Sequence, residues 1–332
     1  MTKTERTAYN CVRRGVAKTR AELSKVMDVS RPTASTLADS LINSGFLRDG
    51  GKWHSSGGRN PTLLLVCPEA FSLVGMDLGF RDRVSGALVD AAGNIVRGSD
   101  IMMSPDNPER AADAVTRLWE RLDPDFSASG IGLAVPGTLD AATGTVSDCD
   151  LPGFGGNELF RLLRKRFVGK FVYAAPRLQL AAISEGFGGA ADREADFMLL
   201  TLGKIPEAVF YINGRCFVGA HGSVGTLGDL PTISYDGSEW TTFGEALSAD
   251  VLNRVHPTPE QLATVCANAL RHVLSIVGIG LIVLAGRFRD FDDDFMPLLE
   301  RRLSRFGCNV KMAVFGRFST SRGAALQTHI GV

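Results

Sequence analysis

Long apolar runs are missing from this 332-residue sequence. No segment approaches the roughly 18 uninterrupted apolar residues of a membrane-spanning helix, and the N-terminus, MTKTERTAYN, lacks the apolar stretch of a signal peptide. Paired cysteines are missing as well. The six cysteines are far apart and form no C-x-x-C motif, so we expect reduced, mostly buried thiols and no metal site. These absences predict a cytoplasmic protein that has no membrane segment.

Net charge is also missing, because 36 Lys and Arg residues balance 36 Asp and Glu residues. The balance conceals an uneven distribution. Residues 1–65 contain 11 Lys and Arg against 5 Asp and Glu, a net charge of +6, so the remainder carries −6. A basic N-terminal part on an acidic body favours a polyanionic partner for the N-terminal part. With 45% hydrophobic residues, the chain is long enough to bury a sizeable core in two or three domains.

Residues 19–47 are the most informative stretch, because their pattern predicts two short helices joined by a tight turn. Thr19 stands three residues before Glu22, which is the spacing of a reciprocal capping box at a helix start. The core face of this first helix is predicted to consist of Ala21, Leu23 and Val26.

A second helix is predicted to begin after Ser30, a good N-cap, with Pro32 in its first turn. Its buried stripe follows the helical period and consists of Ala34, Leu37, Ala38 and Leu41. The opposite face carries short hydroxyl and cationic side chains, namely Arg31, Thr33, Ser35, Thr36 and Ser40. Such side chains suit phosphates and base edges in the major groove of double-stranded DNA, and Arg20 is predicted to contact a phosphate. The alternative is an ordinary small helical pair.

The residues after this helix predict a hairpin wing. Gly45 to Leu47 close the helix, and the segment KWHSSGGRNP precedes a strand-like run at residues 62–66. The tip of this wing carries Lys52, His54 and Arg59 among glycines. An arginine flanked by glycines can approach a narrow minor groove closely, where the electrostatic potential is most negative.

Beyond the wing the pattern changes to α/β. Buried strands are predicted at residues 71–78, 129–135, 197–202, 208–212 and 281–284, a hairpin at 83–97, and helices at 108–122, 157–167, 179–186 and after Ser319. The helix at 157–167 is basic. Two α/β units in series predict a cleft between them.

Eight sequence pieces occur in an order that is specific in combination, although each piece is weak alone. They are the winged helix, GGRNP, VGMDLG, GLAVPGTLDAATGTV, DLPGF, AAISEGFGGA, INGRCFVGAHGSVGTLGDLP and FGEALS. In this order the chain resembles the ROK family of repressors, open reading frames and sugar kinases. The resemblance implies a two-lobed, actin-like ATPase fold of the ribonuclease H-like type behind the winged helix. We place the domains at 1–66, 70–185 and 186–332, with the alternative that the last helix returns to the first lobe.

Four parts of the family's kinase machinery are altered in this sequence. Pro176-Arg177 occupies the place of the family's Asn-Asp pair, and a guanidinium cannot act as the general base. The family's glycine-rich phosphate loop aligns with residues 203–209, which include a proline and a glutamate. Phe80-Arg81 replaces the Gly-Thr of the family's first phosphate loop. The family's glycine-rich turn on the adenosine side of the nucleotide site reads Leu-Ala-Gly-Arg here, at residues 284–287. The resemblance therefore predicts that kinase activity is lost and that the protein is not an enzyme.

The positions that hold sugar hydroxyls in the family are altered as well. They correspond here to Asp150, Arg177, Thr226, Asp229 and Glu245, of which only Glu245 matches the family. The family's zinc-binding histidine and cysteine-rich loop are absent, so we predict neither a metal nor another cofactor. An arginine facing several carboxylates suits a modified or acidic effector, or it closes a disused site as an ion-pair network. The sequence leaves both open.

The leading interpretation is a DNA-binding transcriptional regulator of the repressor type, with a body that dimerises and senses a sugar-like effector. A homodimer, or a dimer of dimers, would bind a palindromic operator. One alternative is a sugar kinase with an unusual base. The other is a constitutive dimeric DNA-binding protein without an effector.

Overall fold

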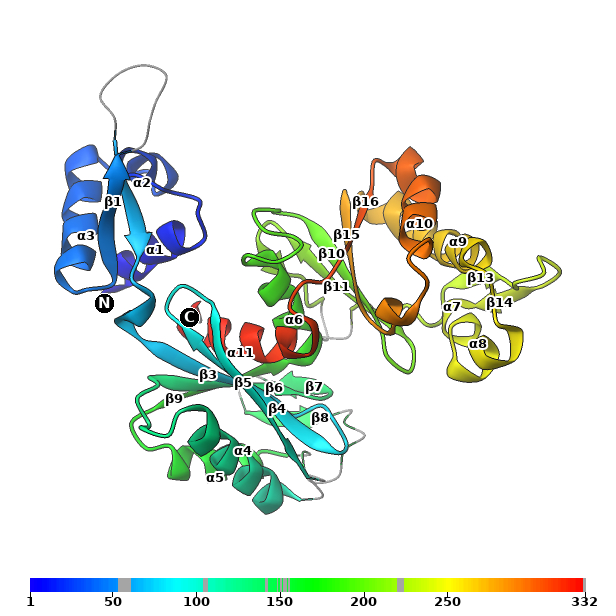
Figure 1. Ribbon diagram of the computed structural model, residues 1–332, viewed down its shortest axis with the longest axis horizontal. Coiled ribbons are helices and arrows are strands. Elements are labelled where there is room, and N and C mark those ends of the chain that lie inside the picture. Colours follow the sequence, from blue (N-terminus) through cyan, green and yellow to red (C-terminus); the bar gives the residue numbers. More distant parts are fainter. Residues whose placement is uncertain are drawn as a thin grey trace. The chain divides into compact units, whose positions relative to one another are not determined.

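The structure is a computed structural model that describes residues 1–52, 61–103, 107–140, 143–147, 149, 151, 154, 156–219 and 224–330. The chain forms two compact units (Figure 1). Unit 1 contains residues 1–177 and 320–332, and unit 2 contains residues 178–319. The chain therefore passes from one unit to the other twice. None of the helices in the described part of the chain is long and apolar enough to cross a membrane.

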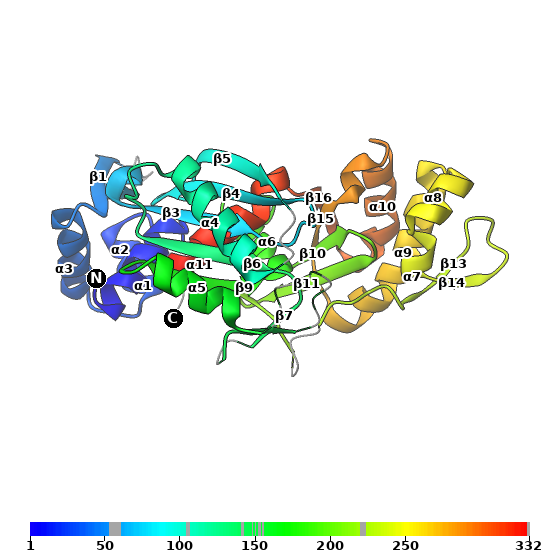
Figure 2. The same ribbon diagram turned by 90° about the horizontal axis from the view of Figure 1, so that it is seen from below.

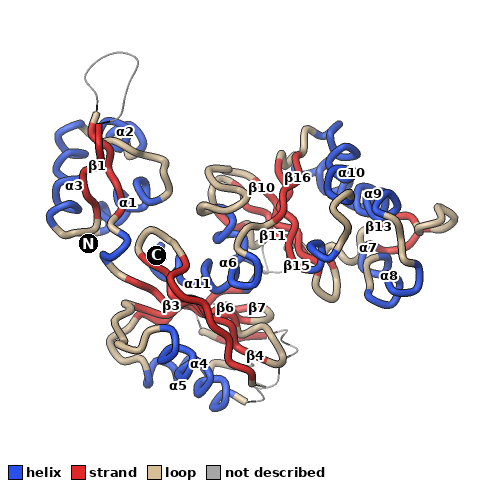
Figure 3. Tube along the Cα trace, in the orientation of Figure 1, coloured by secondary structure: helices blue, strands red, loops and turns tan. Residues whose placement is uncertain are grey.

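The N-terminal part of unit 1 is a winged helix, which we call the head. Its elements are α1 (Lys3–Arg13), α2 (Arg20–Val26), α3 (Arg31–Asn43), β1 (Leu47–Lys52) and β2 (Thr62–Val66). The two strands pair antiparallel, with Leu47 opposite Val66, as the wing prediction requires. A small apolar core formed by all three helices and both strands holds the head together. Figure 3 shows the three helices grouped around the two strands.

Two features of the head differ from the sequence-based expectation. The first helix, α1, was not predicted, although a complete capping box between Thr2 and Glu5 begins it. In α2, Leu23 is buried as expected, but Ala21 and Val26 are exposed, because this helix contacts the core with a narrower face than predicted. The capping of α2 is also not reciprocal, since the Glu22 carboxylate accepts from the backbone N–H of Lys18 instead of Thr19.

The rest of unit 1 is an α/β lobe around a five-stranded sheet in the order β5-β4-β3-β6-β9. Its elements are η1 (Pro68–Ala70), β3 (Ser72–Asp77), β4 (Arg83–Asp90), β5 (Ile95–Met102), α4 (Pro108–Leu122), β6 (Gly130–Val135), the hairpin β7 (Thr138–Asp140) and β8 (Thr145–Ser147), α5 (Glu158–Arg166), β9 (Phe171–Pro176) and α11 (Ser319–Ile330). Strands β3, β6 and β9 are parallel, whereas β3, β4 and β5 pair antiparallel. Helices α4 and α5 cover one face of this sheet and α11 covers the other (Figures 1 and 2).

The position of α11 corresponds to the stated alternative, in which the last helix returns to the first lobe. Residues 320–332 belong to unit 1, so the second unit ends at Ser319 and not at 332. Two glycines of the sheet allow this packing. A Cβ on Gly75 would meet the Ser321 carbonyl oxygen at 1.8 Å, and one on Gly132 would meet the Ala324 carbonyl oxygen at 2.0 Å. Only glycine at both positions lets the helix backbone approach the sheet this closely.

Unit 2 contains a second five-stranded sheet, in the order β12-β11-β10-β15-β16. Its elements are α6 (Arg177–Gly186), β10 (Phe197–Leu202), β11 (Pro206–Ile212), β12 (Arg215–Cys216), β13 (Pro231–Ile233), β14 (Trp240–Thr242), α7 (Phe243–Ala246), α8 (Ala249–Val255), α9 (Pro259–Val277), β15 (Leu281–Gly286), η2 (Arg287–Asp290), α10 (Phe295–Leu303), η3 (Ser304–Phe306), β16 (Asn309–Met312) and η4 (Gly316–Phe318). Helices α9 and α10 pack on one face of the sheet, and α6 packs on the other. The change from unit 1 to unit 2 falls after Arg177, eight residues before the predicted boundary.

Candidate functional site

The helix α3 has the solvent-exposed face expected of a recognition helix. Its N-terminus is capped by the Ser30 hydroxyl, which accepts from the Thr33 N–H at 3.2 Å. Ala34, Ala38 and Leu41 are buried in the head, and Leu37 is half-buried against the same core. The opposite face presents the predicted side chains, of which Arg31, Thr33 and Thr36 are exposed and Ser35 is half-buried. Ser40 is turned toward α1 instead, where its hydroxyl donates to Glu5 at 2.6 Å.

Among the described residues, the two threonine hydroxyls on this face bond to neighbours within α3 and its cap. The Thr33 and Ser30 hydroxyl oxygens are 2.7 Å apart, and the Thr36 hydroxyl donates to the Pro32 carbonyl at 3.1 Å. These bonds hold the two side chains in place, and a hydroxyl oxygen can still accept a further hydrogen bond. A rigid, polar helix start of this kind can meet the edges of base pairs without first reordering its side chains.

Arg20 has a structural role that the sequence did not reveal. Its guanidinium donates to Asp39 of α3 at 2.7 Å and to Asp49 of β1 at 2.8 Å. The hydrogen bond that Arg20 donates to Asp49, together with the one to Asp39, raises the pKa of Arg20 above its ordinary value. Arg20 therefore braces α2 against α3 and β1. The predicted contact between Arg20 and a DNA phosphate would have to compete with both carboxylates.

The wing is described only at its base. Lys52 closes β1, where its backbone pairs with Thr62. The side chain of Lys52, together with His54 and Arg59, lies outside the residues that the structure describes. Their predicted contacts with the minor groove stay predictions.

A buried contact joins the head to the lobe of unit 1. The Tyr9 hydroxyl of α1 donates to the Ala91 carbonyl, in the turn between β4 and β5, at 2.8 Å. Burial raises the pKa of Tyr9 to about 12. The neighbouring Arg13 is almost fully buried, and this burial lowers its pKa to about 10. In the same turn, the Gly93 carbonyl accepts from Arg322 of α11 at 2.8 Å. Sequence patterns did not indicate any of these side chains.

In the lobe of unit 1, Arg177 forms a two-pronged ion pair with Asp77. The Nε and Nη2 atoms of Arg177 donate to the two carboxylate oxygens of Asp77 at 2.6 and 2.8 Å. Asp77 is only 1% exposed, whereas Arg177 is 31% exposed. The backbone N–H of Gly79 also donates to Asp77, at 2.9 Å, and the guanidinium lies 4.7 Å from the Phe80 ring centre. The side chain of Arg177 therefore contacts the segment that aligns with the family's first phosphate loop.

The segment that aligns with the family's glycine-rich phosphate loop begins with a tight turn. Residues 203–205 join β10 to β11, and the Gly203 N–H donates to the Ile205 carbonyl at 3.3 Å. From Pro206 onward the backbone belongs to the antiparallel ladder, with Pro206 opposite Leu202. Pro206 has no N–H, and the Ala208 N–H donates to the Gly225 carbonyl at 2.7 Å, so these groups do not form a cradle for a phosphate.

The predicted effector residues are distributed over both units. Thr226, Asp229 and Glu245 are exposed residues of unit 2, on two segments joined by a 2.8 Å hydrogen bond from the Gly244 N–H to the Gly228 carbonyl. The Glu245 carboxylate accepts from the Thr241 hydroxyl at 3.0 Å. Asp150 lies outside the described residues. Arg177 belongs to unit 1, and its carboxylate partner is Asp77, so the predicted convergence of all five on one pocket stays a prediction.

Glu185 of α6 is a buried structural residue. Its carboxylate accepts from the N–H groups of Ala190, Val314 and Phe315 at 3.0 to 3.3 Å. It also accepts from the Ser319 hydroxyl at 3.1 Å. Glu185 thus fixes the segment that leads into α11. Within the described part of the chain, His, Cys, Asp and Glu side chains do not gather in a group of three or more that could hold a metal ion.

Comparison with known proteins agrees with the resemblance drawn from the sequence. The family model described as ROK family matches residues 73–240, about half of the chain. The xylose repressor of Caldicellulosiruptor bescii is 28% identical over 222 residues, which cover 65% of this chain and 55% of that protein. The xylose repressor of Bacillus subtilis is 26% identical over 228 residues, which cover 66% of this chain and 57% of that protein. The matches thus span little more than half the length of these curated relatives.

Solved structures with the same fold include both regulators and kinases. A ROK family transcriptional regulator, a homologue of the E. coli MLC protein, superposes with a TM-score of 0.76 at 16% identity, covering 98% of this chain and 95% of that one. A ROK hexokinase from Thermus thermophilus superposes with a TM-score of 0.64 at 21% identity, covering 78% of this chain and 98% of that one. The predicted fold class, a winged helix followed by the two-lobed fold of these proteins, is confirmed.

Proposed function

This chain belongs to the ROK family, and from that premise we propose that it is a DNA-binding transcriptional regulator of the repressor type. The observation that carries the proposal is the exposed N-terminal face of α3 in a winged helix. The names of the xylose repressors to which the chain is similar support the direction of regulation.

In this proposal Arg31, Thr33, Ser35 and Thr36 contact the major groove. The net charge of +6 on residues 1–65 supplies the attraction to phosphates. Lys52, His54 and Arg59 of the wing contact the adjacent minor groove. A homodimer places two such heads on the half-sites of a palindromic operator, separated by about 10 bp or a multiple of it.

The test is operator binding by substituted proteins, after an operator has been selected from genomic fragments with the parent protein. Replacing Arg31 or Thr33 with alanine is expected to weaken binding by about 1–3 kcal/mol, roughly five- to 150-fold. Thr36→Ala has a matched control in Thr7→Ala, because both hydroxyls are exposed and both donate to the carbonyl four residues earlier at 3.1 Å. Thr36→Ala should weaken binding and Thr7→Ala should not. If the Arg31 and Thr33 variants bound the operator with the same affinity as the parent, the assignment of α3 as the recognition helix would be refuted.

We also propose that the body has lost kinase activity. The ion pair between Arg177 and Asp77 supports this, because a fixed cation fills the position of the general base and a carboxylate of the phosphate loop is engaged. The turn at residues 203–205 supports it independently. Purified protein incubated with ATP and a panel of sugars should release no ADP above the rate without sugar. Sugar-dependent turnover would favour the alternative, a kinase with an unusual base.

The body is proposed to sense a small effector and to dimerise. An effector acts by binding one arrangement of the units more tightly than the other, and the head then follows its buried contact with the lobe. Because four of the five positions for sugar contact differ from the family, unmodified glucose or xylose is expected to be a poor effector. Calorimetry that detects submillimolar glucose or xylose binding would contradict this expectation. Operator affinity that no metabolite changes would instead indicate a constitutive regulator.

A further inference from the structure

Two carboxylates stand on the two elements of the head that are proposed to contact DNA, and both engage Arg20. The guanidinium donates through Nη2 to Asp39 of α3 at 2.7 Å and through Nη1 to Asp49 of β1 at 2.8 Å. Asp39 follows Ser35 by four residues and Thr36 by three, so it continues the exposed face of α3 by one turn. Asp49 lies in the strand that leads into the wing. We call these three charged side chains the Arg20 cluster, and one cation against two carboxylates gives it a net charge of −1.

The other carboxylates of the head are placed differently. Residues 1–65 contain five Asp and Glu residues. Glu5 and Glu22 accept from the backbone N–H groups of residues that precede α1 and α2, and Asp28 lies in the turn between α2 and α3. The Arg20 cluster therefore places two of five carboxylates beside a single arginine. A carboxylate near the DNA-binding face repels phosphates, so both oppose the attraction that the net charge of +6 supplies.

The ion pairs of the Arg20 cluster lie at the surface and can be exchanged for other partners. Arg20 is 27% exposed, while Asp39 and Asp49 are 57% and 51% exposed. Ion pairs between exposed side chains contribute little to stability, because water solvates the separated charges well. A phosphate accepts from a guanidinium in the same two-pronged geometry as a carboxylate. Arg20 can thus leave its partners for a phosphate while both carboxylates stay hydrated.

We propose that Asp39 and Asp49 set the affinity of the head for DNA by holding Arg20 away from the phosphate backbone. The proposal rests on the proposed function, because it requires that the head binds DNA. Arg20 reaches a phosphate only when it gives up its carboxylate partners, and this exchange lowers the affinity. Since a phosphate contact carries no sequence information, the two carboxylates weaken binding to every DNA sequence by about the same factor. They determine how tightly the head binds and not which sequence it selects.

The experiment is fluorescence anisotropy of a labelled DNA duplex of random sequence, titrated with the full chain between about 50 and 200 mM salt. Asp39→Asn and Asp49→Asn preserve the size of each side chain, but a neutral amide oxygen holds a guanidinium more weakly than a carboxylate does. The double variant should gain one phosphate contact. Its affinity in 0.1 M salt should rise close to tenfold, and the slope of log K against log salt should steepen by about 0.9. Each single variant should gain less, because the remaining carboxylate still holds Arg20.

The decisive control repeats the two substitutions in an Arg20→Gln background. The change in net charge is the same in both backgrounds, so an effect of charge alone would be equally large in both. If the carboxylates act through Arg20, the gain in affinity should be at least about fourfold smaller without the arginine, and the slope should not steepen. Asp28→Asn is the matched single control, because it removes an exposed carboxylate of the head that is not part of the Arg20 cluster. It should leave the slope unchanged.

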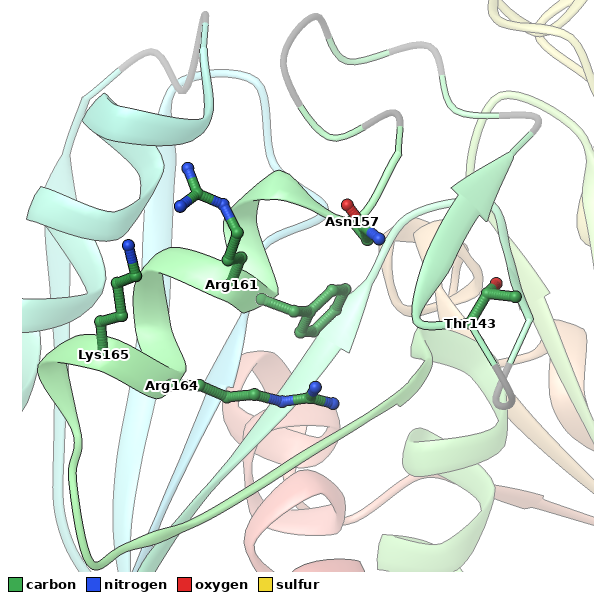
Figure 4. Close-up of a pocket in the computed structure, with 6 residues that line it drawn as sticks. Thr143, Asn157, Arg161, Arg164 and Lys165 are labelled. Atoms are coloured by element: carbon green, nitrogen blue, oxygen red, sulfur yellow. The ribbon is translucent and has the colours of Figure 1, made fainter.

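A second control concerns another basic surface of unit 1, on α5. Arg161, Arg164 and Lys165 line a hollow of about 360 Å³ there. Figure 4 shows Lys165 and Arg164 extending from different sides of the helix. Random-sequence DNA could contact such cations independently of the head. The Asp39 and Asp49 substitutions are therefore repeated with Arg164→Gln and Lys165→Gln, and their gain in affinity should be the same with and without the α5 changes.

Failure of the proposal is distinguishable from failure of the proposed function. If the parent bound DNA but the double variant bound no more tightly, or if the gain were equally large without Arg20, the proposal alone would be wrong. A gain on random-sequence DNA that did not also appear on the selected operator would contradict the uniform effect. If the parent bound no DNA even at low salt, the proposed function would fail and this proposal with it. Thermal unfolding of each variant checks that the head is folded.

Discussion

The ion pair between Arg177 and Asp77 makes a quantitative prediction about stability. Removing one partner of a fully buried pair leaves an uncompensated charge and destabilises a protein by about 3–5 kcal/mol. Asp77 is 1% exposed, but Arg177 is 31% exposed, so water reaches part of the guanidinium and the effect is reduced. We therefore expect Arg177→Met to lower the free energy of unfolding of unit 1 by about 2–4 kcal/mol.

The double variant Asp77→Asn with Arg177→Met should be less destabilised than the sum of the two single variants. It leaves no buried carboxylate without a cation, and the expected coupling energy is about 1–3 kcal/mol. A third variant, Gly79→Ala, tests the same contact without removing a charge. The added Cβ would meet the Arg177 side chain at 2.0 Å and force the guanidinium away from Asp77.

Urea unfolding followed by tryptophan fluorescence measures these free energies. Trp119 is fully buried in the core of unit 1, and replacing Trp53 and Trp240 with phenylalanine makes its emission the only tryptophan signal. The unfolding free energies of the variants can be compared by linear extrapolation if they depend on urea concentration with the same slope. If Arg177→Met changed the free energy by less than about 0.5 kcal/mol, or if the single effects were additive, the contact would not stabilise the lobe and the reasoning would be refuted.

Three further predictions concern other buried or bonded groups. Tyr9→Phe leaves the Ala91 carbonyl buried without its donor and should lower the free energy of unfolding by about 1–3 kcal/mol in urea titrations, and a change near zero would show that this contact does not secure the head. Glu185→Gln directs an NH₂ group at backbone donors and should lower the thermal midpoint by several degrees in calorimetry, whereas an unchanged midpoint would contradict the role of its carboxylate. Hydrogen bonds from Ser234 and Ser238 lower the pKa of Asp236 to about 2, so its stabilising effect is present above its ordinary pKa of 3.8 and lost as pH falls toward 2. Asp236→Asn should therefore lower the midpoint at pH 7, with a difference that narrows below about pH 4, and a difference independent of pH would refute this account.

Local sequence patterns were sufficient to predict the structure of a segment where the segment's own residues determine it. Ser30, Pro32 and the stripe of Ala34, Ala38 and Leu41 specify where α3 begins and which face it buries. The buried apolar runs at 72–77 and 130–135 became parallel strands, and the basic helix at 157–167 became α5. The order of motifs was sufficient to identify the family, because each motif is short and its position in the chain carries the information.

Contacts between distant residues were decided only by the tertiary structure. The sequence identified Arg177 as an unsuitable base, but its pairing with Asp77, a hundred positions earlier, depends on how β3 meets the start of α6. Arg20 was predicted to contact DNA, which stays a prediction, and its ion pairs with Asp39 and Asp49 could not be read from the sequence. The sequence left open whether the closing helix belongs to the second lobe or returns to the first, and the space at Gly75 and Gly132 admits it to the first. Periodicity reports which face of a segment is buried, whereas the partner across that face is set by chain topology, which a local pattern does not contain.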